Sequence, residues 1–167
     1  SGIARHTNGR FAFFTKDDGL PTNEIEGLYV DGRQRLWLMT VSNGVCRIDL
    51  PESDRPHCRH YTTADGLSSN ETRRAVEDRW GRIYITTDRG VDRLDPDTGR
   101  VKHFTPADGL ARGDVAFALR DRKGALWFGT NHELSRLVPA LEDASSPLPV
   151  FVSAMHVSGR SQPIVDR

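Results

Sequence analysis

Residues 62–67 read TTADGL, and the same phrase recurs as TKDDGL at residues 15–20 and as TPADGL at residues 105–110. In each copy an aromatic residue with an aliphatic neighbour follows, 17 residues after the leucine: Leu36-Trp37, Ile83-Tyr84 and Leu126-Trp127. The aspartates of the three phrases, Asp18, Asp65 and Asp108, lie 47 and 43 residues apart. A repeat of about 40–50 residues with strand-like content is typical of a β-propeller blade.

Aligning the copies predicts four short strands, named A to D, in each unit. Strand A covers residues 24–31, 71–78 and 114–121, and strand B covers 35–40, 82–87 and 125–130. Strand C covers 44–49, 90–95 and 133–138, and strand D covers 10–15, 57–62 and 100–105. The predicted blades are therefore residues 24–62, 71–105 and 114–138. In this alignment residues 10–15 form an orphan outer strand, and the third unit has no strand D of its own.

Strand B is apolar at consecutive positions, as in Leu36-Trp37-Leu38 and Leu126-Trp127-Phe128. Alternating apolar residues would indicate one wet face, whereas such runs indicate a strand covered on both faces. Sheets sandwiched between neighbouring sheets supply that cover. We predict an all-β fold, a partial β-propeller of about three four-stranded blades.

Turn residues between strands A and B differ in the first copy. Asp78 to Gly81 and Asp121 to Gly124 place an aspartate at the start of the turn and a glycine where φ is positive. The first copy, Asp31-Gly32-Arg33-Gln34, moves its glycine. The sequence therefore predicts a different turn there.

Residues repeated in every unit are expected to be architectural, because a catalytic site is needed only once. They include the arginines of strand C and the threonines that end strand B: Arg47, Arg93, Arg136, Thr40, Thr87 and Thr130. Pairing of the arginines with carboxylates of neighbouring blades is favoured over a basic ring that faces a ligand.

Composition excludes some classes of partner. The chain has 23 Lys plus Arg and 23 Asp plus Glu, so its formal net charge is zero. Nucleic acids and anionic membranes are bound by clustered positive charge, which such a chain lacks in bulk. No run of 18 apolar residues is present, so no membrane-spanning segment is predicted.

Cys46 and Cys58 are the two cysteines of the chain. A disulfide would indicate an oxidising compartment, but two thiols are far from a disulfide framework. A hairpin centred near Ser53 pairs Cys46 with about Tyr61 rather than with Cys58. We therefore favour two free buried thiols and keep the disulfide as the alternative.

The pattern F/Y-T-x-x-D-G-L, followed by D-x-x-G-x-L-W and G-L/V-x-R-L-D, resembles the two-component regulator propeller repeat. Residues 60–95 and 103–137 meet it nearly in full, residues 13–49 meet it with the shifted turn glycine, and the resemblance covers residues 10–138. The Gly-His and Trp-Asp pairs of WD40 blades and the Gly-Gly pair of kelch blades are missing. Residues 139–148 read as a linker, and residues 149–167 are similar to the start of an immunoglobulin-like Y_Y_Y domain.

The resemblance implies the C-terminal blades of a bacterial sensor propeller. Such a region lies in the periplasm or elsewhere outside the cytoplasm, although no signal peptide is recognisable in these residues. It implies binding of an unknown small ligand, for which carbohydrate-derived and other periplasmic molecules are the candidates. It also implies signal transduction by output domains that these residues do not include. The number of blades in the whole protein stays open.

Motifs for chemistry are missing from the sequence. No Walker loop, no nucleophile elbow and no His-Glu-x-x-His motif occurs, and we predict no catalytic residue, cofactor or metal site. Ligand-binding candidates lie in the loops before strand A and between strands B and C, where the copies differ. They are Asn23, Asn43, Asn70, Arg89, Arg112 and His132.

Three functions follow from this reading. The first is a non-enzymatic sensor region that binds a ligand or partner. The alternatives are a propeller scaffold for protein–protein interaction and a propeller enzyme such as a lyase, for which His132 and Glu133 are the residues to alter. Because residues 10–15 are orphaned, we also predict head-to-tail pairing of two copies, in which this strand completes the third blade of the partner and closes a six-bladed ring.

Overall fold

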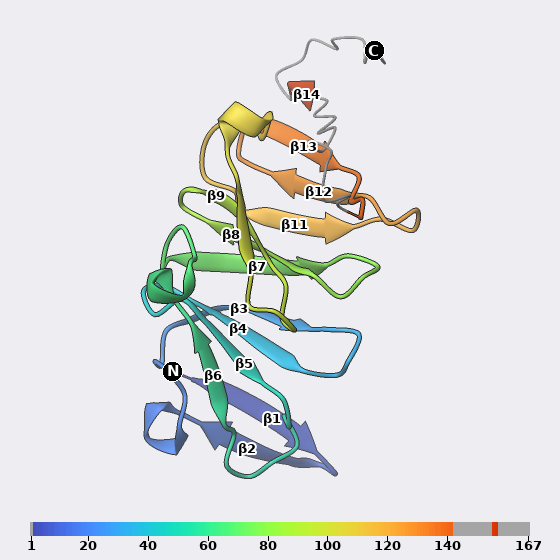
Figure 1. The fold of residues 1–167 in the computed structure, drawn as a ribbon. Helices are drawn as coiled ribbons and strands as arrows, with labels where there is room; N and C mark the ends of the chain where they lie inside the picture. Colours follow the sequence, from blue (N-terminus) through green and yellow to red (C-terminus); the bar gives the residue numbers. More distant parts are fainter. Residues whose placement is uncertain (1, 142–154, 157–167) are drawn as a thin grey trace.

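The computed structural model describes residues 2–141 and 155–156, and in this part of the chain the fold is a partial β-propeller (Figure 1). Three four-stranded antiparallel sheets and one two-stranded hairpin lie face against face in a fan. The remaining regular structure consists of three 3₁₀ turns, η1 (Lys16–Asp18), η2 (Thr63–Asp65) and η3 (Pro106–Asp108). The prediction of an all-β partial propeller is confirmed. None of the described residues forms a helix long and apolar enough to cross a bilayer.

Each sheet follows the predicted order of strands A, B, C and D. The first contains β3 (Ile25–Val30), β4 (Leu36–Thr40), β5 (Val45–Ile48) and β6 (Cys58–Tyr61). The second contains β7 (Thr72–Glu77), β8 (Ile83–Thr87), β9 (Gly90–Leu94) and β10 (Val101–Phe104). The third contains β11 (Phe117–Arg120), β12 (Leu126–Gly129), β13 (Glu133–Leu137) and β14 (Met155–His156).

The predicted orphan strand is not an orphan. Residues 10–15 contain β2 (Arg10–Phe14), which pairs antiparallel with β1 (Ile3–Thr7), a strand that the sequence reading missed. Asn8 and Gly9 join them with φ of 50° and 77°, as two-residue hairpins require. Gly2 then occupies the place of Gly44 and Gly90, since a Cβ on any of the three would collide with a carbonyl oxygen at the end of strand D. The hairpin β1–β2 is therefore strands C and D of a further blade.

The expectation that the third unit lacks a strand D is also corrected. β14 pairs with β13, with Met155 opposite Leu134 and His156 opposite Glu133. The predicted head-to-tail pairing placed residues 10–15 of one copy beside strand C of the third unit of another copy. In this structure β1 of the same chain pairs with β2, and β14 pairs with β13. The remaining residues of the predicted Y_Y_Y segment, and 142–148 of the predicted linker, lie outside the described residues.

The repeated phrase Thr-x-x-Asp-Gly-Leu forms the 3₁₀ turns between strand D and the next strand A. In the second copy, Asp65 Oδ2 accepts hydrogen bonds from the backbone N–H of Thr62 at 2.9 Å and from its hydroxyl at 3.0 Å. Gly66 ends the turn with φ of 100°, a conformation in which only glycine is unstrained. Leu67 then enters the core with 4% of its surface exposed.

Strand B is covered on both faces, as its consecutive apolar residues predicted. Trp37, Leu38 and Met39 are fully buried. Trp37 and Met39 pack against the second sheet, and Leu38 packs toward the β1–β2 hairpin. At about 25 cal/mol per Å² of apolar area removed from water, these contacts between sheets stabilise the array.

The turn between strands A and B of the first unit has the same hydrogen bond as the equivalent turns of the second and third units. Gln34 donates its N–H to the carbonyl of Asp31 at 2.9 Å, as Gly81 does to Asp78 and Gly124 to Asp121. Gln34 reaches this geometry with φ of 63°. The predicted difference is wrong, because a glutamine here adopts the left-handed conformation that glycine adopts elsewhere.

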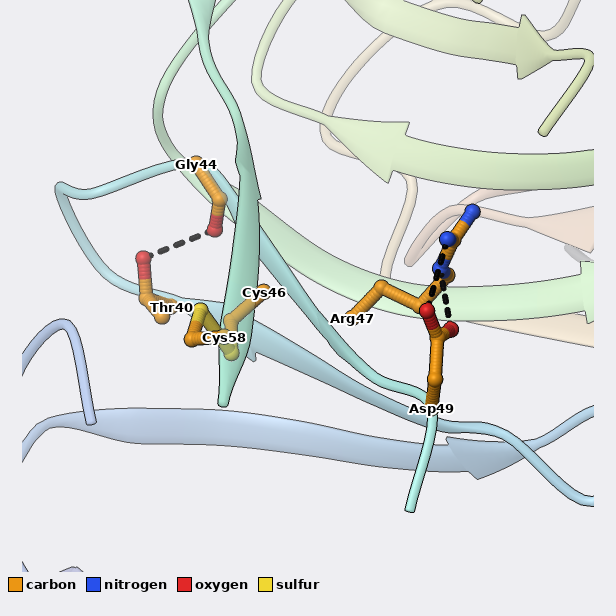
Figure 2. The surroundings of a disulfide bond; sticks show 6 residues. All are labelled: Thr40, Gly44, Cys46, Arg47, Asp49 and Cys58. Carbon is orange, nitrogen blue, oxygen red and sulfur yellow. Dashed lines mark hydrogen bonds and ion pairs between the residues drawn. A yellow bond between two sulfur atoms is a disulfide. The ribbon is translucent and has the colours of Figure 1, made fainter. Parts of the chain in front are cut away.

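The favoured reading of two free thiols is wrong as well, since Cys46 and Cys58 form a disulfide (Figure 2). The hairpin register places His60, not Tyr61, opposite Cys46. Cys58 is two residues from His60 and therefore shares a face with Cys46, whereas the predicted register would have put it on the other face. The Cα atoms lie 5.4 Å apart, within the usual range for a disulfide.

Candidate functional site

One end of the sheets carries both kinds of loop in which ligand residues were predicted. Gly44, in the β4–β5 turn, donates its N–H to the carbonyl of Asn70 at 2.8 Å, and Gly2 donates to that of Asn23 at 3.1 Å. In the third sheet the N–H of Arg112 donates to Glu133 Oε2 at 3.0 Å. These bonds join the loop before strand A to the turn between strands B and C. We call this end the loop face; it carries η1 to η3 in Figure 1.

Two of the six predicted residues hold the loops themselves. The Oδ1 atom of Asn23 accepts the backbone N–H of Lys16 at 2.8 Å, and that of Asn70 accepts the N–H of Thr63 at 2.9 Å. In the third copy Pro106 takes the place of Lys16 and Thr63. Proline has no N–H to satisfy, and Gly113 stands where the asparagine would be. The amide oxygens of Asn23 and Asn70 therefore have an architectural role.

The other four predicted residues are exposed, one on each of the first two sheets and two on the third. Asn43, Arg89 and His132 each occupy a turn between strands B and C, where their backbone N–H groups donate to the threonine that ends strand B. Arg112 lies in the loop before β11. The fold thus places all six on the loop face, two per sheet, rather than in a single cluster.

Two β-bulges lie where strand A leaves the loop face. The register of β3 against β4 shifts between Ile25 and Gly27, and that of β7 against β8 shifts between Thr72 and Ala75. A bulge adds a residue and redirects its side chain, and bulges are common beside functional sites. When the units are aligned on Asp31, Asp78 and Asp121, the bulge position holds Glu26, Arg73 and Ala116.

Charged side chains at the bulges form ion pairs between neighbouring sheets. Arg73 Nη2 lies 2.6 Å from Glu71 Oε1 and 3.3 Å from Asp114 Oδ2, which belongs to the third unit. Arg74 Nη1 lies 3.9 Å from Glu26 Oε1 of the first sheet and donates to the Glu26 carbonyl at 2.9 Å. We call these five residues the bulge rim. The hydrogen bond from Arg73 to Glu71 is the main reason why the pKa of Arg73 is raised.

The bulge rim borders two hollows. Glu26, Glu71, Thr72 and Arg73 line one of about 240 Å³. Glu26, Gly27 and Arg74 line part of the other, of about 530 Å³. Side chains of the rim are 27–59% exposed, so their remaining donors and acceptors face solvent. Alternating carboxylates and guanidinium groups can bind a polar molecule that carries both donors and acceptors.

Sequence reasoning missed Glu26, Arg73 and Arg74 because it searched the loops and treated strand A as framework. The signal was present in the alignment, since Arg73-Arg74 in the second copy stands against Glu26-Gly27 and Ala116-Phe117. Because the repeats otherwise agree, such a change of charge indicates that the fold does not require a particular residue at this position.

Two arginines of strand C, Arg5 and Arg47, connect successive sheets. Arg5 Nη1 donates to the carbonyls of Pro51 and Ser53, at 3.1 and 2.9 Å. Arg47 Nη1 donates to the hydroxyl of Tyr61 at 3.0 Å and to the carbonyl of Pro96 in the second unit at 3.4 Å. Arg47 is also paired with Asp49 (Figure 2). For Arg47 the predicted link between blades is present, but its acceptor in the next unit is the carbonyl of Pro96 rather than the predicted carboxylate.

His103 lies against a buried carboxylate. Its Nδ1 atom is 2.7 Å from Asp92 Oδ1, and Asp92 Oδ2 accepts hydrogen bonds from both the N–H and the hydroxyl of Ser68. In the third sheet Ser135 takes the place of Asp92 and accepts the N–H of Ala111. This cluster therefore joins strand C to the loop before strand A by hydrogen bonds. Within residues 2–141 and 155–156 no group of three or more His, Cys, Asp or Glu is placed to hold a metal ion.

No family model and no curated protein matches this chain. Among solved structures, it is similar to the extracellular domain of a candidate one-component system, BT4673, from B. thetaiotaomicron, with 19% identity and a TM-score of 0.63 over 84% of this chain and 23% of that chain. It is also similar to the extracellular domain of a candidate hybrid two-component system, BT3049, from the same organism, with 23% identity and a TM-score of 0.67 over 86% of this chain and 19% of that chain.

A third similar structure is virginiamycin B lyase from Staphylococcus aureus, with 14% identity and a TM-score of 0.60 over 82% of this chain and 42% of that chain. The chain thus spans less than half of each of these proteins. At such identities the likeness shows the fold, and the same fold carries a lyase as well as extracellular domains of signalling systems.

Proposed function

We propose that this chain is part of an extracytoplasmic sensor region of a bacterial signalling receptor, and that it binds a small polar ligand without catalysis. The observation that carries the proposal is the bulge rim. The residues at its bulge positions, Glu26, Arg73 and Arg74, change charge from one repeat to the next, although the surrounding framework is repeated. Ligands of repeat proteins usually meet such variable residues on a rigid scaffold.

Two further observations support the proposal. Extracellular domains of signalling systems have the same fold, which is support by analogy. The disulfide between Cys46 and Cys58 fits an oxidising location such as the periplasm, because disulfides rarely persist in a reducing cytoplasm.

The ligand that we propose is carbohydrate-derived. Sugars carry hydroxyl groups that donate and accept together, and carboxylates beside guanidinium groups satisfy both roles. A propeller scaffold for protein partners is the second candidate, favoured by the exposed apolar strands at both ends of the fan. The lyase fold neighbour keeps an enzyme as the third.

The test is a thermal-shift screen of neutral and acidic oligosaccharides with three proteins. Arg73→Ala removes the charge that pairs with Glu71 and Asp114. Arg79→Ala is the matched control, since Arg79 is exposed in the turn at the opposite end of β7. We expect a ligand that raises the Tm of the wild type and of Arg79→Ala in a saturable manner. Arg73→Ala should bind it at least about tenfold more weakly, or about 1.4 kcal/mol.

Other outcomes would favour the alternatives. If Arg73→Ala bound the sugar as tightly as the wild type, the bulge rim would not be the site. Turnover of the ligand, abolished by changes at His132 or Glu133, would favour an enzyme.

A further inference from the structure

We propose that the open face between β1 and β3 is a docking site for a two-stranded β-hairpin, which completes the blade that β1 and β2 begin. This groove has a volume of about 680 Å³ and is lined mainly by apolar side chains, together with charged and polar residues such as Arg33 and Glu52. The apolar side chains include Ile3, Phe14, Leu28, Val30, Leu36 and Ile48. The groove shares Ile3, Ala4 and Leu28 with the hollow of about 530 Å³ beside Glu26 and Arg74, so a hairpin docked here would also cover part of that hollow. The proposal does not depend on the proposed sensor function.

The position of β1 and β2 indicates which strands would fit the groove. Arg5 reaches from β1 to the carbonyl of Pro51 in the loop that follows β5. Arg47 reaches in the same way from β5 to the carbonyl of Pro96 in the loop that follows β9. The hairpin therefore stands beside the first sheet as the first sheet stands beside the second. Among the described residues, however, β1 pairs only with β2, whereas β5 and β9 each pair on both edges.

Exposure on β3 locates the uncovered surface. Leu28 and Val30 are 59% and 53% exposed, whereas Ala75 and Glu77, at the same positions of β7, are 9% and 8% exposed. Ala75 is covered by residues of strand B from the preceding sheet, chiefly Trp37 and Met39. Leu28 and Val30 therefore lie where strands A and B of a preceding blade would cover them.

These positions define the chemistry of the occupant. Its second strand lies antiparallel to β1 and forms the ladder that the free edge of β1 offers, as in β-strand addition. That strand places a tryptophan or tyrosine over Leu28 and Leu36, where Trp37 and Tyr84 lie in the other sheets. Its first strand is joined to it by an Asp-x-x-Gly turn and covers the rest of the groove.

The chain contains a hairpin that tests the proposal. In the second unit, residues 71–89 form strands A and B and lead directly into Gly90, the counterpart of Gly2. Adding these 19 residues in front of Gly2, in place of Ser1, therefore copies the natural register. In the added segment Ile83→Thr and Ile85→Thr keep its outer face polar, because both isoleucines face the preceding sheet in the second unit.

We expect the extended chain to exchange its β1 amides at least about tenfold more slowly, and its Tm to rise by about 5 °C or more. Two matched controls should show neither gain. One is the same extension with Tyr84→Asp in the added copy, which puts a charge where the aromatic ring would lie. The other is the unchanged extension on a chain with Leu28→Asp, a substitution that the unextended chain tolerates because Leu28 is exposed.

Three results would overturn the proposal. The extension could leave exchange at β1 and the Tm unchanged. It could give the same gain in both controls, which would mean that the contact is non-specific. Sedimentation could show that the unextended chain is a dimer with β1 already protected, in which case a second copy covers the groove.

Discussion

The indole nitrogen of Trp37 donates a hydrogen bond to Asp31 Oδ2 at a distance of 2.8 Å, and Trp127 donates to Asp121 Oδ2 at 2.9 Å. The other oxygen of Asp31 accepts the N–H of Arg35 at 2.9 Å and so fixes the turn between strands A and B. One carboxylate thus joins this turn to the aromatic ring that packs between sheets. The six-residue interval between aspartate and tryptophan is therefore part of the repeat's structure.

This relationship predicts a loss of stability in acid. Burial alone would raise the pKa of Asp31, but hydrogen bonds from Trp37 and Arg35 outweigh it and hold the pKa below its usual value. The stability that the ionised carboxylate contributes is complete above the unfolded pKa of about 3.9 and is lost as pH falls through the folded-state pKa. Asp31→Asn should lower the free energy of unfolding by about 1–3 kcal/mol at pH 7.

Urea denaturation between pH 7 and pH 3 is the measurement. The wild type should lose stability below about pH 4–5, and Asp31→Asn should lose less over the same interval. Asp17→Asn, in the exposed first 3₁₀ turn, should follow the wild-type curve. A full acid loss in Asp31→Asn would mean that other carboxylates are responsible.

Much of this fold could be predicted because each unit repeats its own turn chemistry. Strands β3 to β13 lie within three residues of their predicted bounds, because aspartate and glycine mark most of the turns. The strand β1 was not predicted, because no Asp-Gly-Leu phrase precedes it, although Gly2-Ile3-Ala4-Arg5 matches Gly44-Val45-Cys46-Arg47. The outer strand β14 matches no repeated sequence, so its pairing is a tertiary effect.

The candidate site was less predictable than the fold. The loop face followed from the repeat, but Asn23 and Asn70 proved to satisfy backbone groups. The bulge rim depends on one extra residue in each of β3 and β7. No glycine, proline or aspartate pattern in the sequence predicts these bulges. The disulfide depended on register: a shift of one residue decides whether Cys58 shares a face with Cys46.

Gln34 provides a second prediction. It holds φ of 63° in the turn where the other copies have Gly81 and Gly124. A left-handed conformation costs a non-glycine residue about 1–2 kcal/mol. Gln34→Gly should therefore raise the free energy of unfolding by about 0.5–1 kcal/mol, after the greater entropy of unfolded glycine is counted.

Chemical denaturation measures this change, with Lys123→Gly as its control. Lys123 precedes the positive-φ residue of the third turn, so glycine there should be neutral or destabilising. Equal effects of the two substitutions would show that backbone strain at Gln34 is not the cause.

The disulfide predicts sensitivity to reductant. Cys46 and Cys58 are separated by 12 residues and close a short loop between β5 and β6. A crosslink over such a loop stabilises a protein by about 2–3 kcal/mol. Reduction should lower the free energy of unfolding by this amount and release two thiols in a thiol assay. The double variant Cys46→Ala/Cys58→Ala should start at the lower stability and be indifferent to reductant, and a wild type with the same indifference would contradict the bond.

The third copy has Pro106 at the position of Thr63 and Gly113 at the position of Asn70. This difference predicts that the contributions of Thr63 and Asn70 to stability are coupled. Asn70 accepts the N–H of Thr63 in the second copy, and Pro106 removes the need for that bond in the third. Asn70→Ala should therefore lower the free energy of unfolding by about 1 kcal/mol. Thr63→Pro should be tolerated, because proline suits the first position of a helical turn and is found there in η3.

In the Thr63→Pro background the donor is gone, so Asn70→Ala should cost much less than it does in the wild type. A double-mutant cycle measured by chemical denaturation should give a coupling energy of about 0.5–1 kcal/mol between positions 63 and 70. Asn43→Ala, on an exposed turn of the same loop face, should cost close to nothing in either background. If Asn70→Ala cost the same with Thr63 and with proline at position 63, the asparagine would act through some other contact, and its place among the ligand-binding candidates would be strengthened.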